Sequence, residues 1–296
     1  MDTSLQASVW NAGKASRSVA SPIAIPRVNV MGVGIHNVNL DSALIATFWA
    51  AHAAGVRGYV TVTGVHGVME SQSDPHLKAI HNRSMLSLPD GVPMVWVGRS
   101  RGHATMSQVY GPDLMRAVFA RSAGSSERHF LWGGGDGVVN ILKQKLITRN
   151  PGVVIVGVET PPFRPLTHDE EIELVDRINR ARPHFFWVGL STPKQERFMG
   201  GFLERQGDSL QLDGQGFIML GVGAAFDVEA GLVKEPPRWL RGTGFGWLYR
   251  LVKEPKRLWK RYLRNNPRFI LGMLQQTLHP SRFPMHGFDR TGPFDQ

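Results

Sequence analysis

The sequence contains no cysteine among its 296 residues, which excludes disulfide bonds and thiolate metal sites. It also lacks the roughly 18 consecutive uncharged apolar residues that a membrane-spanning helix needs. The most apolar candidate, residues 217–226, is interrupted by glycines and is followed by Asp227. We therefore expect a protein of a reducing, cytoplasmic compartment that contacts a membrane only from its surface.

Several motifs of metal and cofactor sites are missing as well. No two aspartates are two residues apart, so the chain has no D-x-D pair to hold a divalent cation under a nucleotide diphosphate. The histidines show no H-E-x-x-H spacing, and the glycines show no G-x-G-x-x-G spacing. These absences argue against a dinucleotide-dependent dehydrogenase, and we expect chemistry without a metal or a resident cofactor.

Acidic residues are scarce in one segment, and the net charge of +10 arises there. Residues 232–268 contain eleven lysines and arginines but only two acids, Glu235 and Glu254. The remainder of the chain is nearly neutral, so the positive charge belongs to a local surface.

Short β-branched runs alternate with amphipathic stretches from about residue 28 to residue 228, which is typical of an α/β fold with a mainly parallel, Rossmann-like sheet and helices on both faces. Thr167 followed by Glu170, and Thr192-Pro193 followed by Gln195, resemble capped helix starts. The strands are expected at residues 28–33, 58–63, 85–88, 129–132, 153–158, 184–190 and 217–222.

The chain divides into four predicted parts. Residues 1–25 have the composition of a disordered tail and lack the features of a secretory signal. Residues 26–231 form the α/β domain, residues 232–279 a basic C-terminal appendage, and residues 280–296 an irregular tail.

One strand end precedes a turn that suits a nucleotide. The strand containing Thr61 and Thr63 leads into Gly64 and His66, where backbone N–H groups at a helix start favour an anion such as a diphosphate. A tight turn with glycines for packing is the alternative.

In the next unit Pro89-Asp90-Gly91 is an ordinary turn sequence. Asp90 nevertheless stands at the carboxyl end of a strand, where α/β proteins bind ligands, and its carboxylate can accept a proton from a hydroxyl.

Two further strand ends offer polar side chains. In residues 188–196, Lys194 lies in the first turn of a helix, where it either faces a phosphate or points into water. In residues 221–227, small residues including Gly223 allow a ligand to approach the backbone, and Asp227 either binds a ribose or base or caps a helix.

The appendage is strongly amphipathic from Trp247 onward. Plotted as one helix, its tryptophans and leucines occupy one side and its lysines and arginines the other, with Pro255 suited to the first turn of a second helix. Such a helix fits either an anionic membrane surface or a solvated face packed on the domain.

The sequence closely resembles the WecG/TagA/CpsF glycosyltransferase family in six segments taken in order, namely residues 61–67, Pro89-Asp90-Gly91, residues 110–114, residues 189–196, residues 221–227 and residues 247–262. It looks most like the exopolysaccharide-synthesis branch of that family in the stretches TVTGVHG, STPKQE and YRLVKEPKRLWKRYLRNNP. The resemblance implies metal-independent, inverting transfer from a UDP-sugar to a polyprenyl-diphosphate-linked acceptor at the inner face of the cell membrane, with no nucleic-acid partner. A homo-oligomer is left open.

The same resemblance implies roles for individual residues. Asp90 matches the family's catalytic base, and Gln195 and Asp227 match positions in the nucleotide-sugar pocket. The arginines implied to neutralise the lipid or UDP diphosphate are Arg238, Arg250 and Arg257.

Two residues depart from the family pattern: Gly64 stands where many members carry Asn, and Gln108 where many carry Arg. Both lie among the residues predicted to hold the donor, so N-acetylmannosamine is not assumed as the donor sugar. Two alternatives follow from the sequence, a nucleic-acid-binding protein that uses the basic appendage and a scaffold whose catalytic site has decayed.

Overall fold

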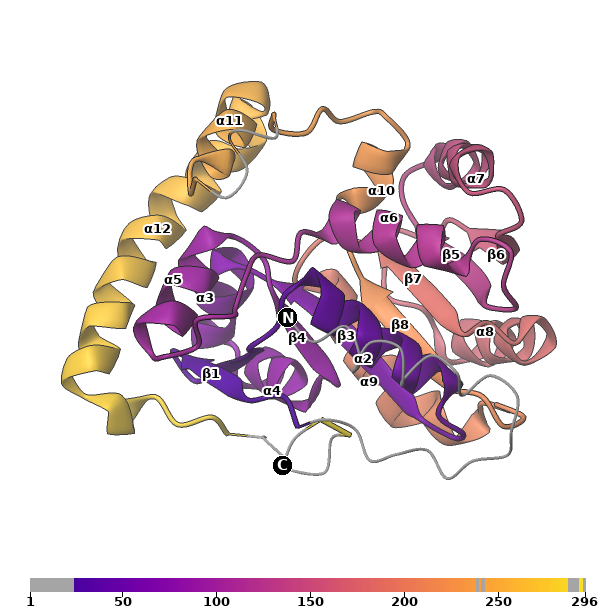
Figure 1. The fold of residues 1–296 in the computed structure, drawn as a ribbon, viewed down its shortest axis with the longest axis horizontal. Helices are drawn as coiled ribbons and strands as arrows, with labels where there is room; N and C mark the ends of the chain where they lie inside the picture. The colour runs from indigo at the N-terminus through magenta and orange to yellow at the C-terminus, as the bar shows by residue number, and fades with distance from the viewer. Residues whose placement is uncertain (1–23, 238–239, 241–242, 287–292, 295–296) are drawn as a thin grey trace, which may run out of the picture.

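The computed structural model describes residues 24–237, 240, 243–286 and 293–294 (Figure 1). Most of the predicted disordered tail, residues 1–23, lies outside this range, and so does Arg238.

A six-stranded, entirely parallel sheet forms the centre of the domain, in the order β4-β3-β8-β7-β5-β6. This confirms the predicted α/β, Rossmann-like fold, and six of the seven expected strands appear within two residues of their predicted bounds. They are β3 (Arg57–Thr63), β4 (Leu86–Pro89), β5 (Arg128–Gly133), β6 (Val154–Glu159), β7 (Phe185–Gly189) and β8 (Phe217–Gly221).

The seventh expected strand, residues 28–33, is instead a hairpin outside the main sheet. Strands β1 (Arg27–Val30) and β2 (Val33–His36) pair antiparallel. Met31 and Gly32 connect them with φ angles of 54° and 84°, the left-handed values that a two-residue hairpin turn requires. The apolar run therefore folds back on itself and does not continue as one strand.

Helices cover both faces of the sheet (Figure 1). One face packs against α2 (Leu40–His52), α6 (Gly111–Ser122) and α7 (Val138–Arg149), and the other against α4 (Pro75–Arg83), α8 (His168–Ala181) and α9 (Lys194–Gln206). Burial explains the arrangement, because central strands such as FFWVG and FIMLG are apolar at successive positions and must be covered on both sides.

The two predicted helix starts had different outcomes. At α8 the Thr167 hydroxyl accepts from the Glu170 N–H and the Glu170 carboxylate accepts from the Thr167 N–H, which confirms the capping box. At α9 the predicted cap is wrong: the helix begins at Lys194, and Pro193 precedes it without a side-chain cap. The Thr192 hydroxyl hydrogen-bonds the buried Glu196 carboxylate instead, at 2.9 Å.

The C-terminal appendage contains two helices, α11 (Gly246–Lys253) and α12 (Pro255–Leu278), with Pro255 in the first turn of the second as predicted. Helix α12 runs along the outside of α3 (Val65–Ser73) and α5 (Val92–Ser100) (Figure 1). Its Phe269 joins the apolar cluster of the β1–β2 hairpin. Its Gln276 side chain accepts a hydrogen bond of 2.9 Å from the Met31 N–H. The second half of α12 is thus firmly packed on the domain.

The last described residues also return to the domain. A 3-10 turn, η4 (Pro280–Arg282), follows α12, and Phe294 is buried against Trp49 of α2. Among the described residues, no helix is both long enough and apolar enough to cross a membrane.

Candidate active site

A cavity of about 950 Å³ opens over the carboxyl ends of β4, β3, β8 and β7. Its floor comes from the turns that follow these strands, and its outer wall comes from the appendage. This is where a parallel α/β sheet positions ligands, because the turns after the strands converge there. The lining includes Gly64, His66, Asp90, Gln108, Gln195, Gly223, Asp227 and Arg250, all predicted site residues.

Backbone hydrogen bonds hold Asp90 at the bottom of this cavity. Its N–H donates to Thr63 O at 2.9 Å, which continues the β3–β4 pairing into the turn. The Val109 N–H donates to Pro89 O at 2.9 Å and brings the segment containing Gln108 alongside. These bonds fix the backbone that carries the Asp90 carboxylate, and a side chain on a fixed backbone is suited to act on a bound substrate.

The electrostatic surroundings of Asp90 suit a general base. Burial raises the pKa of its carboxyl from 3.8 to about 6, while the positive charge of Arg250 and a hydrogen bond from Gln108 act in the opposite direction. A carboxyl with this pKa is ionised at neutral pH and binds a proton more readily than an ordinary aspartate.

Gly64 allows Asp90 to approach β3 closely. A β-carbon at Gly64 would lie 2.8 Å from the Asp90 carbonyl oxygen, so any side chain there must displace the backbone of one turn or the other. The departure from Asn noted in the sequence therefore coincides with a close contact at the candidate base.

Gln195 is buried in the wall beside β8. Its amide donates to Glu196 Oε1 at 3.1 Å and to Gly221 O at 3.3 Å. Burial also raises the pKa of the Glu196 carboxyl, which receives hydrogen bonds from Gln195 and Thr192. Glu196 thus holds two cavity-lining side chains in place, a role that the sequence did not reveal.

His66 links α3 to the appendage. Its ring Nδ1 lies 3.1 Å from Asn265 Nδ2 of α12. Burial and, to a lesser extent, the charge of Arg261 lower the pKa of His66, which favours a neutral imidazole.

Three predicted ligand-binding residues do not line the cavity. Thr61 and Thr63 are buried beneath the floor, where Thr63 Oγ1 lies 3.0 Å from Thr61 Oγ1 and 3.2 Å from His81 Nδ1. Lys194 is exposed and lies outside the lining, in agreement with the alternative that it points into water. Both threonines are buried because β3 has a strand on either side and helices on both of its faces, so the Thr61 and Thr63 side chains do not reach solvent.

The appendage arginines also differ in position. Arg250 lines the cavity, Arg238 lies outside the described residues, and the side chain of Arg257 is not among those described. Sequence reasoning missed Trp96, Tyr110, Arg261, Tyr262 and Asn266, which line the cavity too. Helical periodicity grouped Arg261 with the other cations of the appendage, and only the packing of α12 on α3 brings it to the cavity.

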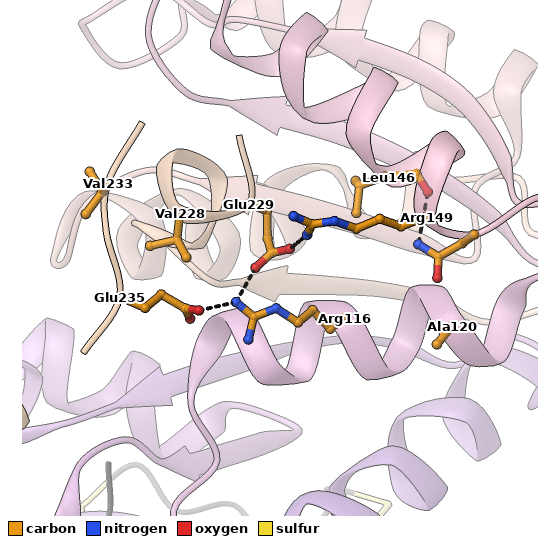
Figure 2. Close-up of a pocket in the computed structure, with 9 residues that line it drawn as sticks. Arg116, Ala120, Leu146, Arg149, Val228, Glu229, Val233 and Glu235 are labelled. Carbon is orange, nitrogen blue, oxygen red and sulfur yellow. Dashed lines mark hydrogen bonds and ion pairs between the residues drawn. The ribbon is translucent and has the colours of Figure 1, made fainter. Parts of the chain in front are cut away.

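A second hollow, of about 460 Å³, lies between α6, α7 and the segment after α10 (Ala225–Glu229) (Figure 2). Arg116 stands between Glu229 and Glu235, at 2.7 Å and 2.5 Å, and Arg149 contacts Glu229 at 2.5 Å (Figure 2). These charges neutralise one another, and their ion pairs form a joint that holds the start of the appendage on the α/β domain. The hollow is therefore a weaker candidate for catalysis than the cavity that contains Asp90.

No cluster of three or more histidine, aspartate or glutamate side chains that could hold a metal ion occurs in the part of the chain that the structure describes.

Comparison with known proteins adds to this geometry. Residues 28–283 match the model of the glycosyl transferase WecG/TagA/CpsF family. Over 196 residues, the chain is 27% identical to the N-acetylglucosaminyldiphosphoundecaprenol N-acetyl-beta-D-mannosaminyltransferase of Bacillus subtilis (strain 168), covering 66% of this chain and 71% of the relative. It is 25% identical over 206 residues to the protein of the same name from Bacillus spizizenii, covering 70% and 74%.

Proposed function

The chain belongs to the WecG/TagA/CpsF family of glycosyl transferases, and from this premise we propose that it moves a sugar from a UDP-sugar to a polyprenyl-diphosphate-linked acceptor. The named relatives act on a diphosphoundecaprenol-linked N-acetylglucosamine, which supports an acceptor of this class. We place the reaction in the synthesis of an exopolysaccharide or another cell-surface polysaccharide.

The observation that carries the proposal is Asp90 at the bottom of the cavity, with its raised pKa and with Arg250 nearby. In the proposed reaction the Asp90 carboxylate takes the proton of the acceptor hydroxyl. The hydroxyl oxygen forms a bond to the anomeric carbon of the donor as the bond from that carbon to UDP breaks. One displacement inverts the configuration at the anomeric carbon and needs a single base.

The departing UDP carries the negative charge that develops during transfer. Arg261 lines the cavity and acts on His66 in the first turn of α3, so it is suited to stabilise that charge together with the backbone N–H groups there. These groups supply positive charge without a metal ion, and we propose metal-independent chemistry on that basis.

Docking at an anionic membrane surface on the inner face of the cell membrane is part of the same proposal. On α12, Trp259, Leu263, Ile270, Leu274 and Leu278 share one exposed side, and Lys256, Lys260 and Arg264 lie beside them. Apolar side chains flanked by cations favour an interface with anionic lipid, where each cation contributes about 1 kcal/mol.

Asp90→Asn tests the assignment of the base. With a panel of UDP-sugars and a lipid-diphosphate-linked N-acetylglucosamine acceptor, we expect transfer to fall by about 100-fold or more. Stabilisation of the protein by UDP should persist, because the nucleotide contacts are retained. A variant that turns over at the wild-type rate contradicts the assignment, and failure of every UDP-sugar to change the stability of the wild type favours the decayed scaffold.

A further inference from the structure

The mouth of the active-site cavity carries three aromatic side chains with large exposed surfaces. Trp96 of α5 is 59% exposed, and Phe245 and Trp247 of the appendage are 57% and 37% exposed. A single exposed apolar residue is ordinary on a protein surface. Three aromatic rings around one opening, from segments about 150 residues apart in the chain, leave apolar area uncovered at the place where a substrate must pass.

Gly244 brings the two segments together. A β-carbon at this residue would lie 3.0 Å from Trp96 Cη2 and 3.1 Å from Cζ2, so the backbone of the appendage rests directly against the indole edge. The φ of Gly244 is +89°, a conformation in which other residues are strained. The contact between α5 and the appendage therefore fixes the Trp96 side chain at the mouth of the cavity.

Charge is placed further in. Arg250 lines the same cavity and is half-buried, and its positive charge acts on the Asp90 carboxyl and on Tyr262. Tyr262 in turn packs against Trp247, with ring centroids 5.5 Å apart. From the inside outward, the cavity thus presents a carboxylate, a cation and then aromatic rings.

Apolar surface continues outside the opening along α11. Leu248 and Val252 follow Trp247 on this helix and are 43% and 70% exposed. A sugar ring needs hydrogen-bonding partners beside any aromatic contact, whereas the hydroxyl of Thr243 at this rim already donates to Leu240 O at 2.8 Å. The rim suits a hydrocarbon better than a carbohydrate.

We infer that Trp96, Phe245 and Trp247 form a subsite for the first isoprenoid units of the carrier lipid, with the attached diphosphate at Arg250. This inference rests on the proposed function for the identity of the ligand. The order of groups in the cavity matches the order in a lipid-linked acceptor, namely the hydroxyl of the sugar, then the diphosphate, then the hydrocarbon. The subsite would select an acceptor by its lipid even before the sugar is placed.

Binding of farnesyl diphosphate and of inorganic diphosphate, each below the concentration at which the lipid forms micelles, tests the subsite without requiring transfer. We expect the wild-type protein to bind farnesyl diphosphate at least tenfold more tightly than it binds inorganic diphosphate. Trp96→Ala should lower this preference at least fivefold, and Trp96→Phe should retain most of it, since a ring remains. Phe163→Ala is the matched control, because Phe163 is an exposed aromatic residue, at 87%, that does not line the cavity.

Three outcomes overturn the inference: no preference in the wild type, an unchanged preference in Trp96→Ala, or an equal loss of affinity for both ligands. Stabilisation by UDP, measured on the same variants, shows whether the donor side is intact. If farnesyl diphosphate binds as expected but no UDP-sugar supports transfer, the lipid subsite stands and the proposed transferase activity fails.

Discussion

The side-chain amide of Gln108 donates a hydrogen bond to the carboxyl of Asp90, at the bottom of the cavity. The family resemblance places an arginine at this position in many members. Burial raises the pKa of the Asp90 carboxyl to about 6, and the neutral Gln108 donor opposes this rise less than a guanidinium would. Residue 108 thereby adjusts a pKa that burial mainly determines.

The rate of transfer should depend on pH through Asp90. Since only the ionised carboxylate accepts a proton, kcat/KM should fall about tenfold per pH unit below pH 6 and reach a plateau above it. A pH–rate profile with the donor saturating checks this expectation. An acid limb centred near pH 4 would show that burial does not raise the pKa of the base.

The stability of the fold should depend on pH in the opposite sense. The pKa of Asp90 is higher in the folded protein than the ordinary value of 3.8, so the folded state binds the proton more tightly and loses stability as the pH rises from about 4 to about 6. Asp90→Asn should consequently be more stable than the wild type at pH 8, by at most about 3 kcal/mol. Denaturant unfolding of both proteins at pH 4 and pH 8 measures the difference, which should vanish at the lower pH.

Gln108→Arg should shift the acid limb of the pH–rate profile to lower pH. A guanidinium next to the carboxylate favours the ionised form and lowers its pKa by about one unit or more. Gln108→Leu is the matched variant, because it removes the donor without adding charge and should move the limb upward. Identical profiles for the three proteins would mean that residue 108 does not act on the base.

Gly64→Ala should impair catalysis through the position of Asp90. The new β-carbon would lie 2.8 Å from the Asp90 carbonyl oxygen, and the required backbone shift costs about 1–3 kcal/mol. We expect kcat to fall at least tenfold with a lower melting temperature. Gly135→Ala serves as the control, because its β-carbon would make an ordinary contact of 3.7 Å with Val138.

Glu229→Ala should destabilise the joint between the α/β domain and the appendage. The Glu229 side chain is only 1% exposed and contacts both Arg116 and Arg149, so its loss leaves two guanidinium groups without their shared carboxylate (Figure 2). The expected cost is about 1–2 kcal/mol in the free energy of unfolding, less than for a fully buried pair, because the Arg116 and Arg149 side chains are 34% and 53% exposed. Arg164→Ala, which breaks an exposed ion pair with Glu170, should change stability little.

Substitution of Trp259, Leu263 and Leu274 by serine separates membrane docking from nucleic-acid binding. These side chains are 48%, 70% and 57% exposed on one side of α12. If the appendage docks on lipid, the triple variant should bind anionic vesicles at least tenfold more weakly while its cations remain. The nucleic-acid alternative predicts that the protein binds a DNA or RNA oligonucleotide as tightly as it binds vesicles, and that the substitutions leave this affinity unchanged.

Much of the framework follows from local sequence. Apolar runs such as FFWVG and FIMLG are too continuous for a half-exposed strand, so buried parallel strands are the natural prediction, and glycine and aspartate at their ends indicate where a ligand binds. The hairpin at Met31-Gly32 was missed because its turn contains a single glycine within an apolar run, and periodicity alone does not reveal a reversal there.

The sequence by itself determined the sheet, the family and the position of Asp90, because these depend on short-range hydrophobic patterning and on turn residues. Only the tertiary structure decided which side chains surround that carboxyl. Gln108, Arg250 and Tyr262 come from distant segments, and the packing of α12 on α3 and the hairpin determines which face of the appendage turns inward. Burial and charge at a site depend on such long-range contacts, and one-dimensional periodicity does not contain them.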